Sequence, residues 1–277
     1  MTISLTRHGW TQLGAHSYAR RYESFDLTIG AVVGADAVLV VDSRASVAEA
    51  EQLIIDLGSL TDKPVVGVVN THQHYDHTLG NAAFAGIPVI GHESLNETLA
   101  DHLAQTRKAG ASDDERAAAM AASPTRLPDV VLSSAWSIDL GDCLVEVVHP
   151  GPGHTAGDVV TKVTADKVAY VGDLVEQSGP PAYGDDSYPL EWAAALDLVV
   201  GICEPEATIV PGHGDAVDRD FVQTQRQTIL DVANQIRSTA AARMSVDEAL
   251  RQEWPLDPSL LEHAVRRGFE QLGVAAA

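Results

Sequence analysis

The sequence predicts a mixed α/β (α+β) protein in which strands and then helices occur twice around one core. Valine-rich runs bounded by turn residues occur in both halves of the chain, and segments with apolar residues three and four positions apart follow each group. The length of 277 residues suits one large domain. We expect a catalytic unit over residues 1–240 and a helical extension over 241–277, packed on the same domain.

The first half is predicted to begin with a hairpin and to continue as alternating helices and strands. Gly34-Ala35-Asp36 separates two β-prone runs, which is a hairpin signal. Ser46 and Glu49 have the spacing of a capping box, and Gly58 is the expected stop of that helix. Strands are expected at residues 27–33, 37–41, 64–69 and 87–91, and helices at 46–57 and 78–85.

Residues 94–126 are predicted to be a helical excursion between two strands. Leu95, Leu99 and Leu103 recur at helical spacing, and the alanine-rich stretch 115–122 has few large side chains. Lids and substrate walls often occur at such places. A helix that only packs against the domain would have the same pattern, so both interpretations stay open.

The second half repeats the order of strands followed by helices. Ser187 is expected to cap a helix that ends at Gly201, and residues 211–214 are expected to form a loop. Further helices are predicted over residues 222–236, from Ser245 with Glu248 as its capping box, and from Asp257 with Pro258 in its first turn. Strands are expected at 130–132, 136–140, 144–148, 159–163, 168–171 and 207–210.

Acidic residues outnumber basic ones by 39 to 18, which gives a formal net charge of -21. Since no basic run offsets this charge, we expect neither nucleic acid nor a membrane surface as a partner. No apolar run has spanning length and the first residues lack a signal-peptide pattern, so a cytoplasmic location is expected. Cys143 and Cys203 are expected to be core residues rather than a disulfide or metal ligands.

The strongest functional signal is the motif H-x-H-x-D-H, which follows the strand expected over residues 64–69. Its candidate ligands are His72, His74, Asp76 and His77. Imidazoles and carboxylates are the ligands that zinc and its first-row neighbours prefer. A loop at the carboxyl end of a strand lets such side chains converge, so the motif predicts a metal site.

Three later residues share one context, a strand end with an adjacent glycine. They are His154, Asp173 and His213. Glycine allows several loops to approach one point closely. Each residue alone would be expected to lie at the surface or to be hydrogen-bonded, but together, in this order after the motif, they predict the rest of the metal site.

These motifs resemble those of the metallo-β-lactamase superfamily, with the bridging aspartate of its glyoxalase II-like and lactonase-like branches. The resemblance covers about residues 27–214. It implies a four-layer αββα sandwich that holds metals at one edge of its two sheets, here with extra C-terminal helices. It also implies His72, His74 and His154 as ligands of a first metal, Asp76, His77 and His213 as ligands of a second, Asp173 as the bridge between them, and Asp42 as a brace of the metal loop.

A dinuclear metal-dependent hydrolase is the activity that this resemblance implies. Two divalent ions about 3.5–4 Å apart would share a bridging hydroxide that attacks a carbonyl of a small-molecule substrate. Zinc is the expected metal, and iron and manganese are alternatives. Asp76 is expected to orient the hydroxide or to move a proton, and Asp42 to orient ligands through hydrogen bonds.

The resemblance narrows the substrate only to a small ester, thioester or lactone. Asp173 and the missing leader argue against a dedicated β-lactamase, which is kept as an alternative, although promiscuous β-lactam turnover is compatible with the site. Acyl-homoserine lactonases have a tyrosine three residues after the bridging aspartate, where this chain has Glu176. Tyr183 or Tyr188 could reach the site instead. No substrate-binding residue is assigned.

A second alternative is oxygen chemistry. Members of the superfamily that resemble persulfide dioxygenases bind one iron through residues that match His72, His154 and Asp173, all present here. The second ligand set favours hydrolysis, and a non-enzymatic module would be expected to have lost ligands. The sequence does not set the oligomeric state, and a homodimer is compatible with it.

The remaining histidines are expected to be structural or at the surface, with a role beside the metal ligands kept open for His92. They are His8, His16, His92, His102, His149 and His263.

Overall fold

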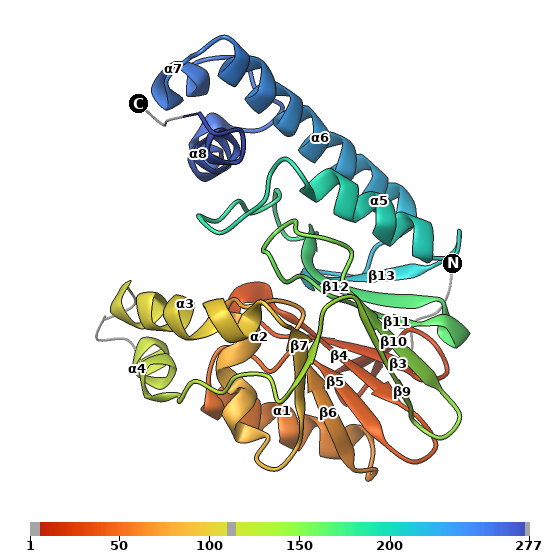
Figure 1. Cartoon of the computed structure of the whole chain (residues 1–277). Coiled ribbons are helices and arrows are strands. Elements are labelled where there is room, and N and C mark those ends of the chain that lie inside the picture. The colour runs from red at the N-terminus through yellow and green to blue at the C-terminus, as the bar shows by residue number, and fades with distance from the viewer. Residues whose placement is uncertain (1–5, 110–114, 275–277) are drawn as a thin grey trace.

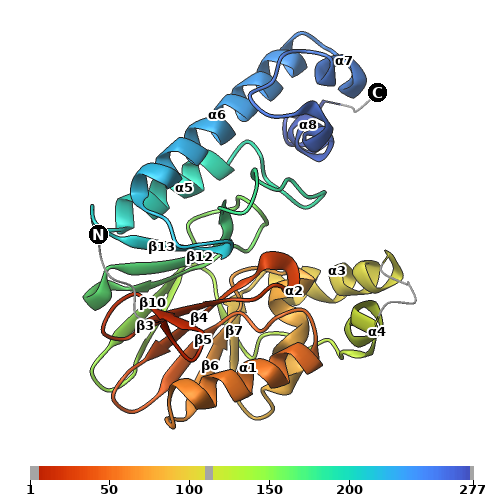
Figure 2. The same ribbon diagram turned by 180° about the vertical axis from the view of Figure 1, so that it is seen from behind.

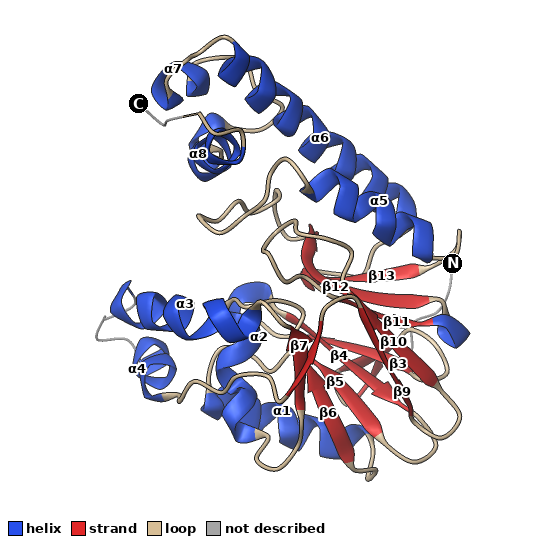
Figure 3. Ribbon diagram, in the orientation of Figure 1, coloured by secondary structure: helices blue, strands red, loops and turns tan. Residues whose placement is uncertain are grey.

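Two β-sheets lie face to face, and helices cover the outer side of each sheet (Figure 1). The view from behind shows the same layers (Figure 2), and colouring by secondary structure separates the central strands from the outer helices (Figure 3). The computed structural model describes residues 6–109 and 115–274. Residues 1–5, which belong to the segment without a signal-peptide pattern, 110–114, in the predicted excursion, and 275–277, in the predicted extension, lie outside the described residues. The αββα sandwich is confirmed.

The first sheet follows the order of the chain. It consists of β1 (Thr6–Arg7), β2 (Trp10–Gln12), β3 (Ser17–Arg21), β4 (Thr28–Val33), β5 (Val38–Val41), β6 (Val65–Val69), β7 (Val89–His92) and β8 (Val130–Leu132). The predicted hairpin joins β4 to β5, and β5 to β8 are parallel neighbours. The carboxyl ends of these parallel strands therefore meet at one edge. Strands β1 to β3 were not located individually by the sequence, because short polar strands lack an apolar signal.

The second sheet has the order β13-β12-β11-β10-β9. Its strands are β9 (Ala135–Asp139), β10 (Leu144–Val148), β11 (Val160–Val163), β12 (Val168–Glu176) and β13 (Thr208–His213). Two predicted boundaries are wrong: β12 continues past residue 171, and residues 211–213 belong to β13 instead of a loop. The two strands pair in parallel as far as Glu176 and His213, with register shifts on the way. Glycine and polar residues in these strand ends hide the β pattern.

Three apolar layers separate the four structural layers. Leu39 and Val41 of β5 face the second sheet, whereas Val38 and Val40 of the same strand face helix α1 (Val47–Leu60). A strand buried on both faces needs a continuous apolar run, which is why the sequence located it. The outer face of the second sheet packs against α5 (Trp192–Ile202) and α6 (Arg219–Ala241). Cys143 and Cys203 are buried in these layers, as predicted.

Two predicted helix boundaries are wrong, and one predicted capping box forms only in part. Gly58 does not end α1, which continues to Leu60, although Ser46 does cap it by accepting from Glu49 N at 3.2 Å. The carboxylate of Glu49 turns to Ser24 and Ala45, so only half of the capping box forms. Ser187 caps nothing, because α5 begins only at Trp192, after a loop that contains Pro189.

Helices also flank the metal motif and the C-terminus. The motif is partly helical: α2 (Tyr75–Thr78) and a 3-10 turn (Leu79–Ala83) replace the helix expected over 78–85. The excursion forms α3 (Leu95–Ala109) and α4 (Glu115–Ala122). In the tail, α7 (Val246–Leu250) has the predicted capping box, whereas Asp257 begins only a 3-10 turn (Pro258–Leu260) before α8 (Glu262–Gln271). None of the described helices has the length and apolar character that a membrane crossing requires.

Candidate metal centre

The seven predicted ligands meet at the edge of the sandwich where strands of both sheets end. His72, His74, Asp76 and His77 follow β6 in the turn that becomes α2. His154 lies in the connection between β10 and β11, whereas the other two are in strands: Asp173 in β12 and His213 at the end of β13. The parallel pairing of β12 with β13 brings Asp173 and His213 together, and an isolated antiparallel bridge between Leu27 and His213 joins the second sheet to the first half of the chain here.

One group of ligand atoms comes from His72, His74, His154 and Asp173. Their candidate donor atoms all lie within 4.8 Å of one another. His74 Nδ1 lies 2.8 Å from His154 Nε2, and Asp173 Oδ2 lies 3.6 Å from the Nε2 atoms of both His72 and His154. This group matches the first predicted ligand set together with the predicted bridge.

A second group comes from Asp76, His77 and His213, whose donor atoms also lie within 4.8 Å of one another. His213 Nε2 is 3.4 Å from Asp76 Oδ2 and 3.2 Å from Asp173 Oδ2. Asp173 Oδ1 is 3.3 Å from His77 Nε2. The carboxylate of Asp173 therefore contacts both groups, which is the position that a bridging ligand needs.

Each of the five histidines has a hydrogen-bond partner on the ring nitrogen that faces away from the centre. Such a partner sets the tautomer and leaves the other nitrogen free to bind a metal. The outward pairs are His72 Nδ1 with Thr71 Oγ1, His74 Nε2 with Asp186, His77 Nδ1 with Asp42, His154 Nδ1 with the carbonyl of Ala182, and His213 Nδ1 with the carbonyl of Phe25.

The inward atoms fit a pair of metal ions. His72 Nε2, His77 Nε2 and Asp173 Oδ1 are buried without a hydrogen-bond partner, which is costly unless another group satisfies them. Four ligands in a tetrahedron around zinc lie about 3.3 Å apart. The spacings of 3.2–3.7 Å between the inward nitrogens and the carboxylates are close to this value. The donor set and its spacing therefore suit zinc-like cations.

Burial and neighbouring charges keep several ligands in the form that binds a metal. Burial lowers the pKa of His154 to about 4 and also lowers the pKa of His72, so both rings are neutral at physiological pH. Burial alone would raise the pKa of Asp173, but the neighbouring His77 and His213 hold it well below its usual value. Neutral imidazoles and an ionised carboxylate are the metal-binding forms.

Asp42 connects the end of β5 to the metal loop. Its Oδ2 is 2.7 Å from His77 Nδ1, and its carboxylate accepts hydrogen bonds from the backbone N and the hydroxyl of Thr71, both at 2.8 Å. Asp42 has φ = 68°, a left-handed conformation that turns the chain sharply after the strand. It therefore holds both the histidine and the first residue of the loop.

Residues 28–213 match the family model described as the metallo-beta-lactamase superfamily. The chain belongs to this superfamily. Two type 2 metallo-beta-lactamases are among its curated relatives. That of Bacillus cereus is 29% identical over 93 residues, which are 33% of this chain and 36% of the relative. That of Bacillus sp. (strain 170) is 24% identical over 187 residues, which are 67% of this chain and 65% of the relative. The chain thus spans about a third of the length of the first relative and about two thirds of the length of the second.

Solved structures of the superfamily share the fold. A metallo-beta-lactamase from Pontibacter korlensis has a TM-score of 0.62 at 21% identity and covers 79% of this chain and 97% of its own. A stereoselective inverting sec-alkylsulfatase from Pseudomonas sp. has a TM-score of 0.74 at 14% identity, over 95% of this chain and 50% of its own. At these identities the likeness concerns the fold alone.

The metal centre of this superfamily member opens into a cavity of about 370 Å³. His102 of α3 and residues 182–186 of the loop 177–191, between β12 and α5, line it together with five of the seven predicted ligands. Tyr183 is among the lining residues, whereas Tyr188 lies against Arg267 instead. The excursion 94–126, for which a role as a substrate wall was kept open, thus contributes the side chain of His102 to the cavity.

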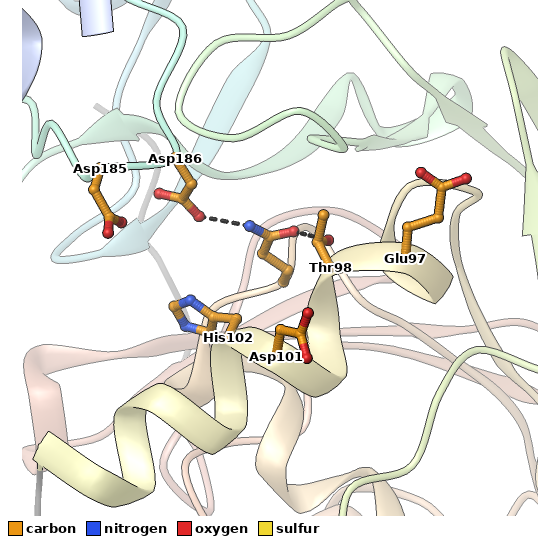
Figure 4. A pocket seen from close by; sticks show the side chains of 7 residues that line it. Glu97, Thr98, Asp101, His102, Asp185 and Asp186 are labelled. Atoms are coloured by element: carbon orange, nitrogen blue, oxygen red, sulfur yellow. Dashed lines mark hydrogen bonds between the residues drawn. The ribbon is translucent and has the colours of Figure 1, made fainter. Parts of the chain in front are cut away.

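A second hollow of about 250 Å³ adjoins the first, since His102, Asp185 and Asp186 line both. Carboxylates of Glu97, Asp101, Asp185 and Asp186 surround it (Figure 4). The described residues that line the two hollows include no lysine or arginine. The approach to the metal centre is therefore acidic.

Sequence reasoning missed three residues of the site. His102 was expected to be structural or at the surface, but its ring stacks on that of His74 at 4.8 Å and 29° and lines the cavity. Asp186 binds His74, and Glu176 lines the cavity with a pKa that burial and Asp173 raise to about 7. Thr98 and His102, four positions apart, were readable as one face of a helix, but no sequence signal showed what that face covers.

His92, for which a role beside the ligands was kept open, stacks instead on His149, at 4.0 Å between the ring centres. Its Nδ1 bonds to Ser94, and His149 Nδ1 bonds to the carbonyl of Asp158. These bonds give both histidines a structural role, as was expected for His149.

Proposed function

We propose that the chain is a dinuclear metal-dependent hydrolase of small, uncharged esters, thioesters or lactones. The observation that carries this proposal is the position of Asp173, whose two carboxylate oxygens contact both groups of ligand atoms. His72, His74 and His154 would hold one ion, and Asp76, His77 and His213 the other. Zinc is the proposed metal. When bound, two such ions lower the pKa of a shared water and polarise the substrate carbonyl.

The remaining chemistry is proposed for side chains of the chain itself. Asp76 Oδ2 lies beside His213 Nε2 and His77 Nε2 in the same cavity, so it is placed to orient the attacking water and to accept a proton. Asp42 keeps His77 in one orientation through the bond to Nδ1. Tyr183 and the loop 177–191 form a wall against which the substrate would pack.

The charge of the cavity supports uncharged substrates. A β-lactam carboxylate or a sulfate ester would meet the carboxylates of Asp185 and Asp186, and no lysine or arginine is among the described residues that line the hollows. Like charges that lie close together repel one another. We therefore propose esters, thioesters and lactones as substrates ahead of β-lactams. The enzyme would act on such a small molecule in the cytoplasm rather than on a macromolecule.

Metal analysis combined with a substrate panel tests this proposal. We expect close to two zinc ions per chain by mass spectrometry and metal-dependent turnover of neutral lactones, thioesters or aryl esters, with β-lactams and alkyl sulfates much slower. Asp173→Ala is expected to lose metal and activity together, whereas Asp231→Ala, on the exposed surface of α6, is a matched control. A single iron with oxygen consumption, or full turnover by Asp173→Ala, would overturn the proposal.

A further inference from the structure

His74 differs from the other four histidines of the metal centre. Its Nδ1 faces the centre and its Nε2 faces outward, whereas the others present Nε2 to the centre. Its outward partner is the side chain of Asp186 in the wall of the cavity, whereas His154, the other histidine with a partner in this wall, bonds to the backbone carbonyl of Ala182. The orientation of this ring is therefore decided outside the metal loop.

Asp186 accepts from two neighbouring residues of the motif. Asp186 Oδ2 lies 3.1 Å from His74 Nε2 and 2.5 Å from Gln73 Nε2, and Oδ1 lies 3.4 Å from His74 Nε2. An ionised carboxylate only accepts hydrogen bonds, so the proton of His74 must be on Nε2. The lone pair of Nδ1 then points towards His154 Nε2 and the other ligands of the first group.

Gln73 in turn is oriented by α3. Its Oε1 accepts from the hydroxyl of Thr98, which leaves its amide nitrogen for Asp186, and the dashed lines in Figure 4 follow this chain of bonds. His102, one turn further along α3, covers the face of the His74 ring. The ring is thus held at its edge by the loop 177–191 and on its face by α3.

We propose that Asp186, held by Gln73, is a positioning residue that fixes the tautomer and the rotation of His74 and ties the cavity wall to the metal loop. This inference rests on the proposed function, because it assigns His74 to the first metal. It makes Asp186 the counterpart of Asp42, which holds His77 in the same way from the first sheet. Loss of such an outer partner weakens metal binding, commonly by about 10–100-fold.

The test measures zinc affinity by competition with a chromophoric chelator, and the absorption spectrum of the cobalt-substituted protein. Asp186→Ala is expected to bind one of its two zinc ions, the one that His72, His74 and His154 would hold, about 10–100-fold less tightly than the unmodified chain and to change the cobalt spectrum. Gln73→Leu is expected to show a smaller loss in the same direction. Asp185→Asn is the matched control, because it removes one negative charge from the same wall but no bond to His74.

The outcomes separate this inference from the proposed function. If the unmodified chain fails to bind two ions, the proposed function fails. If it binds two ions but Asp186→Ala keeps its zinc affinity within twofold and an unchanged cobalt spectrum, the positioning role is wrong. Equal losses in Asp185→Asn and Asp186→Asn would also overturn it, since charge alone would then explain the effect. Should Asp186→Ala not fold, Asp186→Asn and Gln73→Leu give the same readouts.

Discussion

The pKa values of the residues in the metal centre depend on one another because their charges lie close together. The carboxylate of Asp173 lies close to four imidazoles, so a proton or a cation must balance its charge. Burial alone would lower the pKa of His213, but the charge of Asp173 and its hydrogen bond raise it to about 10. In the metal-free chain His213 therefore carries a proton at neutral pH, and a metal must displace it.

Metal binding is accordingly expected to release protons. With a pKa of about 10, His213 is protonated near neutral pH and releases its proton to the buffer when a metal binds, so the apparent metal affinity rises with pH until that value is approached. Titration calorimetry of the metal-free chain at about pH 7.5, in two buffers of different ionisation enthalpy, should show about one or more protons released per chain. Equal heats in the two buffers would contradict this expectation.

At the scale of the elements, the parallel pair β12 and β13 delivers two ligands into one small space. Gly212 of β13 lies directly behind the carboxylate of Asp173 in β12: a methyl group at Gly212 would stand 1.7 Å from Asp173 Oδ1. The close approach of the strand ends thus depends on the absence of a side chain at this position.

Gly212→Ala is therefore expected to displace the bridging carboxylate and to lower the metal content below two per chain. The clash includes the backbone carbon of Gly172 at 2.9 Å, so rotation of the Asp173 side chain alone cannot relieve it. Gly201→Ala, in α5, is the control, since nothing lies within 4 Å of its added methyl group. Full metal content in Gly212→Ala would show that the strand ends adapt.

In helix α1 a glycine-to-alanine substitution is expected to stabilise the chain, in contrast to the damaging substitution at Gly212. Gly58 lies inside this helix rather than after it, has no positive φ, and would place a methyl group in open space. Gly58→Ala is therefore expected to raise the free energy of unfolding by about 0.5–1 kcal/mol, because alanine loses less backbone freedom on folding. Denaturant unfolding of the metal-free chain measures this difference, and a loss of stability would mean that the glycine serves another purpose.

Across the whole molecule, the sequence predicted what is local and missed what depends on distant partners. The ligands of the loop after β6 were recognisable because six consecutive residues carry the motif, and the strands buried on both faces were recognisable from their apolar runs. The four-layer αββα arrangement was implied only by the resemblance to the superfamily. Asp186 was not recognisable, because its partner His74 is 112 residues away and its own loop has no regular pattern. The ends of β12 and β13 were hidden for a related reason, since ligands and glycines replace the apolar residues there.

The C-terminal helices raise the question of whether the chain is one cooperative unit. Val265 and Phe269 of α8 are fully buried in the same apolar cluster as α5 and α6, and Gly268 lets α8 approach Ile236 of α6 closely. Helix α6 itself ends at Ala241, next to the boundary predicted between residues 240 and 241. We propose that residues 241–277 form an extension that folds together with the sandwich.

Phe269→Ala tests this proposal. Removal of a buried phenylalanine costs about 3–5 kcal/mol, and the loss is shared by the whole chain if α8 and the sandwich unfold together. We expect calorimetry to show one transition at a lower temperature, with metal released in that same transition. Glu253→Ala, exposed between α7 and α8, should leave the midpoint unchanged. A new transition at lower temperature, with metal release still at the temperature of the unmodified chain, would contradict the proposal. The C-terminal helices would then be a separate folding unit, because the sandwich would hold its metals without them.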